Sequence, residues 1–425
     1  MILRYLYNVL TYLLAPFLVI RLYWRARKNP AYRERIGERF GFFDYPLETE
    51  HPIWIHAVSV GETIAAVPLV KALQAKHPTI PIVFTTTTPT GSDRVIAAFG
   101  NSLFHVYSPY DIPTVVKSFI EKIKPRLLII METEIWPNML LYAQREKVPV
   151  MLANARLSEK SFKGYSKFNR FIKFILNTIS IIAAQEITDA KRFELLGVPK
   201  ELIQVVGNIK FDVILPPGVK EKGKQLRKLL GENRPIWIAS STHEGEEELV
   251  LSALQIIQKS IPNVLLILVP RHPERFKKVE ELCFSRGLSI VKRSENKACE
   301  GKTAVFLGDT MGELLLFYAA SDVAFVGGSL VATGGHNFLE PALFGLPLIS
   351  GPNLFNFAKI VSLLQDNNAL EIVNDAEELA GQIIQFLSDE NLRKSYGKRA
   401  QEVLEKNRGS LNRHIQLIEK LLHPS

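Results

Sequence analysis

From residue 52 onward, short apolar runs rich in β-forming residues alternate with stretches of helical periodicity, and this alternation occurs twice. Candidate strands lie at 53–57, 82–86, 103–106, 127–131, 148–152, 181–184, 236–239, 265–269, 288–291, 304–307, 323–326 and 346–349. Strands that alternate with helices form parallel sheets with helices on both faces. The turn-forming residues at 215–218 separate the two series. We therefore predict an α/β fold with two Rossmann-like, doubly wound domains facing a cleft.

The length of 425 residues is enough for two such domains with full cores. We place a membrane anchor with its basic flank at 1–28, the first domain at 29–216 and the second at 217–391. The remaining segment, 392–425, is helical in pattern and long enough to cross back to the first domain. The two cysteines, Cys283 and Cys299, lack the spacing of a metal site or of a disulfide framework, as is typical of a reducing compartment.

The first apolar segment runs from Tyr5 to Ile20 without a charged residue. As a helix it is about 24 Å long, whereas the hydrocarbon core of a bilayer is about 30 Å thick. It therefore either spans with its flanking arginines reaching outward or lies in the interface. No small-residue cleavage site follows it, which disfavours a signal peptide. The excess of Arg and Lys from Arg21 to Arg35 predicts that the following domain is cytoplasmic and faces anionic headgroups.

A second basic stretch, 156–173, interleaves Lys and Arg with aromatic residues. Such a pattern is typical of an amphipathic patch on an anionic membrane surface. The alternative interpretation is a solvated basic helix face. Nucleic-acid binding is disfavoured, because the chain has an anchor and no nucleic-acid-binding motif.

Polar residues cluster where the predicted strands of the first domain end, which is where open α/β sheets bind ligands. Glu62 follows the first strand at the start of a helix. It is either a general base or a carboxylate that stabilises the helix N-terminus. Glu132 and Glu134 follow the fourth strand, and Lys210 lies in the segment 207–212. Lys210 is a candidate cation for an acidic donor, or else one partner of an interdomain salt bridge.

The second domain contains four loops suited to a nucleotide. The segment 321–352 has a strand, two Gly pairs and a helix expected at 337–344. Glycines before a helix leave free N–H groups that favour phosphate, and Glu340 in the first turn suits sugar hydroxyls. An ordinary sheet-to-helix crossover is the alternative. The other loops are 240–247, 270–275 and 308–314; Arg271 suits phosphate or carboxylate, and His272 is a weaker candidate.

Eight motifs, in order along nearly the whole chain, resemble one family. They are VSVGE (58–62), METEIWPN (131–138), NARLS (154–158), GNIKFD (207–212), STHEGEE (241–247), PRHPER (270–275), DTMGEL (309–314) and GGHNFLEPA (334–342). Together they look like the 3-deoxy-D-manno-octulosonic acid (Kdo) transferases. The resemblance implies the GT-B glycosyltransferase fold, CMP-Kdo as donor and the lipid A precursor (lipid IVA) of Gram-negative bacteria as acceptor. It also implies an anchor among inner-membrane lipids, with the domains on the cytoplasmic face.

The resemblance also implies residue roles. Glu62 would be the general base of an inverting displacement, and Glu132 and Lys210 would stabilise the transition state. The CMP moiety would be bound by Pro270, Arg271, His272, Met311, Gly312, Glu313, Asn337, Phe338, Leu339 and Glu340. No pair of acidic residues has a nucleotide–metal arrangement, and we therefore predict no essential metal and no other cofactor.

Two alternatives stay open on the residues alone, since their spacing cannot select cytidine or Kdo. One is a UDP-sugar transferase or a sugar-nucleotide epimerase of the same fold. The other is a noncatalytic membrane-bound carrier of lipids or nucleotides, which the position of Glu62 disfavours.

Overall fold

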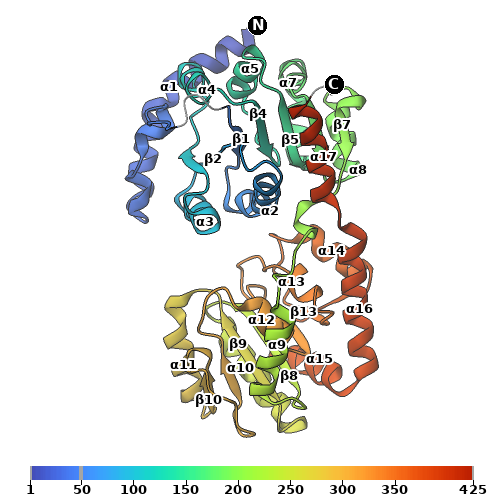
Figure 1. The fold of residues 1–425 in the computed structure, drawn as a ribbon. Helices are drawn as coiled ribbons and strands as arrows, with labels where there is room; N and C mark the ends of the chain where they lie inside the picture. Colours follow the sequence, from blue (N-terminus) through green and yellow to red (C-terminus); the bar gives the residue numbers. More distant parts are fainter. Residues whose placement is uncertain (1, 47–50, 424–425) are drawn as a thin grey trace. The chain divides into compact units, whose positions relative to one another are not determined.

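The computed structural model describes residues 2–46 and 51–423. The chain forms two compact units (Figure 1). The first unit comprises Met1–Asp212 and Arg408–Ser425, and the second comprises Val213–Asn407. Each unit is a parallel sheet with helices on both faces, as the alternation of strands and helices predicts.

The first unit contains a seven-stranded parallel sheet in the order β3-β2-β1-β4-β5-β6-β7. Its strands are β1 (Ile53–His56), β2 (Ile82–Thr86), β3 (Phe104–Tyr107), β4 (Leu127–Met131), β5 (Val150–Ala155), β6 (Ile181–Ala184) and β7 (Ile203–Val205). Its connecting helices are α2 (Val60–Lys76), α3 (Pro89–Phe99), α4 (Pro113–Ile123), α5 (Pro137–Arg145), α6 (Glu159–Ser166), α7 (Asn169–Leu176) and α8 (Ile187–Leu195). The strand order reverses between β1 and β4, which makes their carboxyl ends the expected ligand position.

Both faces of this sheet are covered by apolar side chains. On one face Trp54 and Leu128 pack with Phe119 of α4 and Met139 of α5. On the other face the core includes residues of α2 and α3. Every residue of β1 and β4 is buried, which explains why β4 is an uninterrupted apolar run and why β1 is apolar up to His56.

The second unit contains a seven-stranded parallel sheet in the order β10-β11-β9-β8-β12-β13-β14. Its strands are β8 (Ile236–Thr242), β9 (Leu265–Pro270), β10 (Ile290–Lys292), β11 (Val305–Leu307), β12 (Val323–Val326), β13 (Leu348–Ser350) and β14 (Leu370–Ile372). Its helices are α9 (Val219–Leu230), α10 (Glu246–Ser260), α11 (Phe276–Ser285), α12 (Leu314–Ala319), α13 (Leu339–Ala342), α14 (Ala358–Asp366), α15 (Ala376–Ser388) and α16 (Glu390–Asn407). Here the strand order reverses between β8 and β12.

The C-terminal helical stretch is divided between the units. Instead of one helix over 392–422, the chain forms α16 and α17 (Ser410–Leu422), separated at Gly409, whose φ is +89°. Helix α16 packs so tightly in the second unit that a side chain at Gly397 would overlap the carbonyl of Gly345. Helix α17 contributes Leu417 and Ile418 to the core of the first unit. The units therefore divide after Asp212 and after Asn407, rather than at the predicted boundaries after residues 216 and 391.

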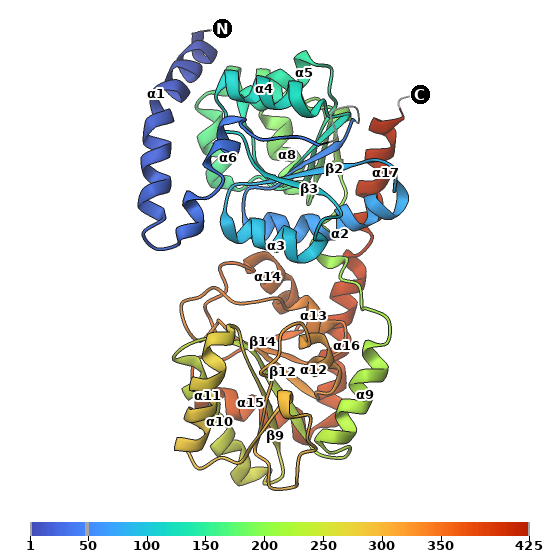
Figure 2. The same cartoon turned by 60° about the vertical axis from the view of Figure 1, so that its left-hand side comes forward.

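The predicted anchor is helix α1 (Ile2–Arg25), which lies along the first unit (Figure 2). Among the described residues it is the one helix long and apolar enough to cross a membrane, judged by length and composition. Its inner face is held to the unit: Tyr7 Oη donates a hydrogen bond to Asp111 Oδ2 at 2.7 Å, and Leu22 is buried. The opposite face exposes large apolar side chains, including Leu6, Leu13 and Phe17.

Candidate active site

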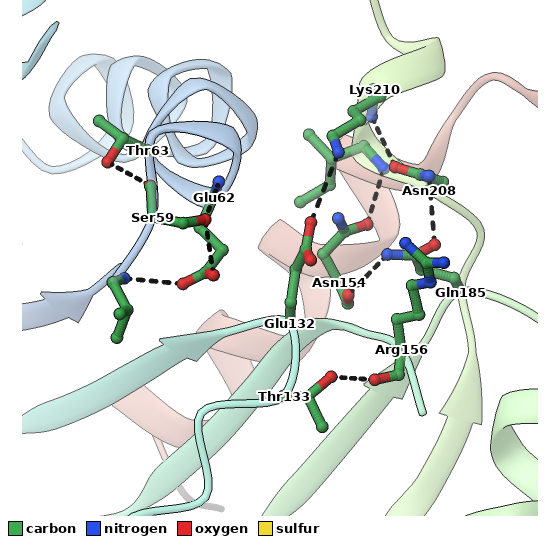
Figure 3. Close-up of polar contacts among 12 residues, drawn as sticks. Ser59, Glu62, Thr63, Glu132, Thr133, Asn154, Arg156, Gln185, Asn208 and Lys210 are labelled. Atoms are coloured by element: carbon green, nitrogen blue, oxygen red, sulfur yellow. Dashed lines mark hydrogen bonds and ion pairs between the residues drawn. The ribbon is translucent and has the colours of Figure 1, made fainter. Parts of the chain in front are cut away.

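Glu62 lies in the first turn of α2, directly after β1, and its carboxylate is fixed by two donors (Figure 3). The Val58 N–H donates to Oε2 at 2.7 Å, and Ser59 Oγ donates to Oε1 at 2.8 Å. Ser59 also caps the helix by accepting from the Glu62 N–H. Burial, together with the charges of Glu134 and Glu132, raises the pKa of Glu62 to about 7, although the hydrogen bonds from Ser59 and Val58 act to lower it. A carboxylate with a pKa near neutrality is suited to general base catalysis.

Two more carboxylates follow β4, the strand next to β1. Glu132 has φ +56°, so β4 ends there, and its Oε1 lies 3.5 Å from Nζ of Lys210. Glu134 Oε2 accepts a hydrogen bond from Nε1 of Trp136 at 2.8 Å, and burial raises the pKa of Glu134. The three glutamates therefore gather at the point where the strand order reverses. The structure brings together all three residues predicted to be catalytic in the first domain, and Lys210 forms its ion pair within this unit.

Lys210 is positioned by a network of amide side chains (Figure 3). Its N–H donates to Oδ1 of Asn208, and the next N–H upstream, from Ile209, donates to Oδ1 of Asn154, each at 3.0 Å. Gln185 Nε2 donates to the Asn154 carbonyl at 2.9 Å, and Asn208 Nδ2 donates to Gln185 Oε1 at 3.2 Å. Asn154, the residue before the last of β5, has a left-handed conformation with φ +52°, which asparagine tolerates better than most residues. The loop that carries Lys210 is thus tied to β5 and β6.

The network continues into the C-terminal helix α17 through His414. The Asn154 N–H donates to Nε2 of His414 at 2.9 Å, so Nδ1 carries the proton and donates to the Ser410 carbonyl at 2.8 Å. Burial lowers the pKa of His414 to about 4. Asp212 caps the same helix by accepting from the N–H groups of Gly409 and Leu411, each at 2.6 Å. No local motif marks His414, because its partner is 260 residues away.

In the second unit, the Gly-rich segment after β12 is organised by a buried carboxylate. Glu246 Oε1 accepts from the Ser329 and Leu330 N–H groups at 3.0 Å, and Oε2 accepts from Gly328 at 2.7 Å. A side chain at Gly327 would meet Glu246 and the Ser240 carbonyl. These N–H groups, which belong to or directly follow the first Gly pair, are therefore used inside the protein and are not donors for a phosphate.

The helix after this segment is also shorter than predicted. Helix α13 covers only Leu339–Ala342 rather than 337–344, because Asn337 Oδ1 accepts from the Leu339 N–H at 3.0 Å and Gly345 reverses the chain with φ +66°. The Gly335 N–H donates to the Gly328 carbonyl at 2.8 Å. A helix of one turn has too small a dipole to bind an anion by itself.

The residues of this segment that were predicted to contact the nucleotide differ in whether their side chains are available to a ligand. Asn337 Nδ2 donates to Glu340 Oε1 at 3.0 Å. Burial raises the pKa of Glu340, although the hydrogen bond from Asn337 and the positive charge of Arg271 partly offset this effect. Arg271 is therefore close enough to interact electrostatically with Glu340. Phe338 and Leu339 are buried, and their side chains serve the core instead of a ligand.

A pair of histidines joins the loops after β8 and β12. Nε2 of His243 lies 2.8 Å from Nε2 of His336, with the two rings parallel, so one imidazole donates and the other accepts. Burial lowers the pKa of His336 to about 3, and both rings are neutral at physiological pH. His272 packs edge-on against His243 with ring centroids 5.3 Å apart. In the sequence, only the position of His336 within the Gly-rich segment indicated that this residue has a role in the site.

The remaining residues that were predicted to bind CMP follow β9 and β11. Pro270 ends β9, and His272 is half exposed and lies 4.0 Å from the Glu274 carboxylate. Met311 is exposed, and Gly312 has φ +82°. The Glu313 carboxylate accepts hydrogen bonds from Nη2 and Nε of Arg293 at 2.9 and 3.0 Å. Burial acts to raise the pKa of Glu313, but the hydrogen bonds from Arg293 and Thr310 hold that pKa below its ordinary value. Glu313 is therefore a partner of Arg293, which sequence reasoning missed.

No group of three or more His, Cys, Asp or Glu side chains that could hold a metal ion occurs among residues 2–46 and 51–423.

Comparisons with known proteins define the class. Residues 34–213 match a family model described as 3-Deoxy-D-manno-octulosonic-acid transferase (kdotransferase), and residues 221–403 match Glycosyl transferases group 1. UDP-GlcNAc 2-epimerase from Neisseria meningitidis is 16% identical with a TM-score of 0.56, covering 87% of this chain and 99% of that one, and shares the fold. The two doubly wound domains thus form a glycosyltransferase of the GT-B class, which confirms the predicted fold class.

Two curated relatives narrow this class to a family. The chain is 43% identical over 421 residues to the 3-deoxy-D-manno-octulosonic acid transferase of Haemophilus influenzae, covering 99% of each. It is 33% identical over 426 residues to the 3-deoxy-D-manno-octulosonic acid transferase of Bordetella pertussis, covering 96% of this chain and 97% of that one. The chain belongs to the Kdo transferase family, and the predicted family is confirmed.

Proposed function

We propose that this protein is an inverting glycosyltransferase that moves Kdo from CMP-Kdo to the lipid A precursor, lipid IVA, in lipopolysaccharide biosynthesis. The observation that carries the proposal is the Glu62 carboxylate. It is buried, fixed by two donors, and adjacent in the fold to the Glu132–Lys210 pair, in a member of the Kdo transferase family. A noncatalytic carrier would not require a carboxylate with a pKa near 7 at this point.

In this mechanism Glu62 acts as the general base. The acceptor hydroxyl oxygen attacks the anomeric carbon of Kdo, and its proton passes to the Glu62 carboxylate. The bond from the anomeric carbon to the phosphate oxygen of CMP-Kdo breaks, and its electron pair leaves with CMP. One displacement on the face opposite the leaving group inverts the configuration. Glu62 then returns the proton to solvent.

Glu132 and Lys210 stabilise the charges that develop in this step. The Glu132 carboxylate favours positive charge on the sugar ring, and the Lys210 ammonium favours the carboxylate of Kdo or the departing phosphate. Their mutual distance of 3.5 Å leaves both groups able to exchange part of the ion pair for contacts with substrate. The network of Asn154, Asn208 and Gln185 restricts the loop that carries Lys210.

We assign CMP to the loops after β8, β9, β11 and β12 of the second unit. Arg271 supplies the positive charge for phosphate, and Asn337 and Glu340 supply polar atoms for the ribose or base. Pro270, Gly312, Phe338 and Leu339 contribute only backbone groups, and Met311 and His272 contribute exposed side chains. Glu313 acts with Arg293, which keeps its carboxylate ionised. We propose that no metal ion is needed, since Lys210 and Arg271 can meet the charge of the leaving group.

We propose a membrane location on the cytoplasmic face of the inner membrane. The outer face of α1 is apolar, and α6 and α7 expose a basic patch of Lys160, Lys163, Lys167, Arg170 and Lys173. Tyr7 of α1 contacts Phe171 of α7, with ring centroids 6.4 Å apart, so these two surfaces adjoin. Because the inner face of α1 is held by Asp111, we place the helix in the membrane interface with its outer face in lipid.

Mass spectrometry of the reaction product tests this function. Purified full-length protein is incubated with CMP-Kdo and the tetra-acylated disaccharide acceptor, and we expect the mass of the acceptor to increase by Kdo. UDP-sugars in place of CMP-Kdo are the control for the alternative donor class. Transfer from a UDP-sugar but not from CMP-Kdo contradicts the donor assignment, and no transfer from any donor contradicts the enzyme assignment.

A further inference from the structure

A groove with a volume of 370 Å³ lies between α1 and two loops of the first unit. Its walls include Tyr7, Leu14 and Leu18 from α1, Ile112 from the β3–α4 loop, and Ile135 and Trp136 from the β4–α5 loop. The volume is in the range of small-ligand sites. Because the walls are mainly apolar, they suit an apolar ligand.

The groove reaches the three glutamates through Trp136. Nε1 of Trp136 donates to Glu134 Oε2 at 2.8 Å, and its ring packs edge-on against His56 with centroids 4.9 Å apart. His56 is the last residue of β1, two positions before Val58, whose N–H holds the Glu62 carboxylate. The same side chain therefore contacts the groove on one side and the residues around the proposed base on the other.

On its other side the groove continues into the surface that we place in the membrane. Leu14 lines the groove and is 44% exposed, and it neighbours Phe17 of the apolar outer face, three positions further along the helix. Tyr7 donates to Asp111 at 2.7 Å and Tyr12 donates to Thr114 at 3.2 Å, which fixes α1 as one wall. The lining also includes Thr11 and Asp111, so a hydrocarbon chain that enters the groove from the membrane meets mainly, but not only, apolar side chains.

We propose that this groove binds one acyl chain of the lipid acceptor and thereby holds the acceptor sugar near Glu62. The inference rests on the proposed function and adds a binding site to it. Helix α1 then forms part of the acceptor site as well as a membrane contact. Each methylene that moves from water into the groove strengthens the binding of a monomeric acceptor about fourfold until the groove is filled.

A chain-length series tests this inference with the full-length protein. Acceptors with the same sugar but short acyl chains of increasing length, and the deacylated sugar, are presented as monomers in detergent-free buffer, at equal concentrations below their critical micelle concentrations. For wild type we expect kcat/KM to rise about fourfold per methylene over the short chains. Leu14→Trp, which fills the groove, should reduce this rise to less than twofold and leave the rate with deacylated sugar unchanged.

The matched control is Leu13→Trp, the same change at the neighbouring residue, which is 65% exposed and does not line the groove. It should keep the full chain-length dependence. If Leu14→Trp lowers the rate with deacylated and acylated acceptors by the same factor, or if wild type shows no dependence on chain length, the groove does not bind the acceptor chain.

A binding measurement separates this inference from the proposed function. In a Trp24→Phe background the other two tryptophans, Trp54 and Trp237, are fully buried. An acceptor with brominated acyl chains should therefore quench mainly the fluorescence of Trp136, and Leu14→Phe, which fills the groove without adding a tryptophan, should reduce that quenching. Quenching without Kdo transfer supports the groove and contradicts the proposed reaction. Kdo transfer without quenching supports the reaction and contradicts the groove, and equal quenching by brominated bulk phospholipid assigns the groove to membrane lipid instead.

Discussion

Nζ of Lys210 lies 3.5 Å from Oε1 of Glu132, and the two residues come from parts of the first unit that are 78 positions apart in the sequence. The pair sits beside Glu62 where the strand order of the sheet reverses. A cation and an anion held this way can each stabilise one developing charge of a glycosyl transfer.

The first prediction concerns this pair. Lys210→Ala should lower kcat for Kdo transfer by about 10²- to 10³-fold, because it removes a charge that acts mainly in the transition state. CMP affinity should change much less than kcat, since the other proposed CMP contacts belong to the second unit. Steady-state kinetics and CMP titration check both values. Lys191→Ala, at an exposed lysine of α8, is the control and should match wild type. An unchanged kcat in Lys210→Ala would remove Lys210 from the mechanism.

The second prediction is a pH profile. Since burial raises the pKa of Glu62 to about 7, the base is protonated below that pH, and kcat/KM should fall about tenfold per pH unit below pH 7. Glu134→Gln removes a nearby negative charge that raises this pKa, so its acid limb should shift to lower pH. Glu62→Gln should fold normally and lose turnover. An acid limb in the same place for wild type and Glu134→Gln would show that another group titrates.

The third prediction concerns acid stability. The pKa of His414 is about 4 in the folded protein and about 6.5 when unfolded, so the unfolded state binds more protons between these values. Stability from this residue is complete above pH 6.5 and is lost as the pH falls towards 4, by about 1.4 kcal/mol per pH unit. Glu62 and Asp111, whose pKa values are raised by burial, act in the opposite direction.

Comparison with His414→Gln isolates this contribution, because glutamine can accept from the Asn154 N–H without titrating. Thermal unfolding of both proteins from pH 8 to pH 4.5 is the measurement. The free energy of unfolding of the variant, relative to that of wild type, should increase as the pH falls below 6.5. A difference that stays constant over this range would mean that His414 does not remain neutral in the fold.

The fourth prediction concerns the donor. Arg271→Ala should raise the Kd for CMP about tenfold or more, since a hydrogen-bonded charge on phosphate contributes about 1.5–3 kcal/mol. Isothermal titration with CMP measures the loss. Lys277→Ala, an exposed lysine of α11, is the control for a general loss of positive charge. If both variants weaken CMP binding equally, Arg271 has no specific contact.

The fifth prediction is that chelation has no effect. Dialysis against EDTA should leave the rate of Kdo transfer unchanged, because the proposed charge stabilisation uses Lys210 and Arg271. Added Mg²⁺ or Ca²⁺ should also have no effect beyond that of ionic strength. Activity that disappears on chelation and returns only with one divalent cation would assign that ion a role in the reaction.

The sequence predicts the sheets well because their strands are buried on both faces. The runs 82–86, 127–131, 181–184 and 323–326 match β2, β4, β6 and β12 residue for residue, since each is largely buried and consists of apolar and β-branched residues. The edge strand β14 was not predicted, because its three residues, Leu370–Ile372, include a glutamate and make too short a run. Boundaries of β3 and β5 moved by one to three residues, as local patterns fix strand ends poorly.

The candidate site was predictable only where a motif is local. Glu62 follows β1 directly, and its neighbours Val58 and Ser59 supply its hydrogen bonds, so its environment can be read from adjacent residues. The role of Glu246 was not predicted, because the N–H groups of Gly328 and Ser329 that it accepts from lie about 80 residues later in the chain. Arg293 and His414 were not predicted for the same reason, because each forms a hydrogen bond with a residue of a distant element.

Helix α17 has a consequence for the order of protein synthesis. The ribosome makes the whole second unit before the helix that supplies Leu417 and Ile418 to the first core. Until then the Asn154 N–H and the Asp212 carboxylate lack their partners on α17. A nascent chain released after Asn407 would contain every proposed active-site residue and still lack the support of the Lys210 loop. The two units can therefore mature in the reverse of their order in the gene, with the N-terminal one completed last.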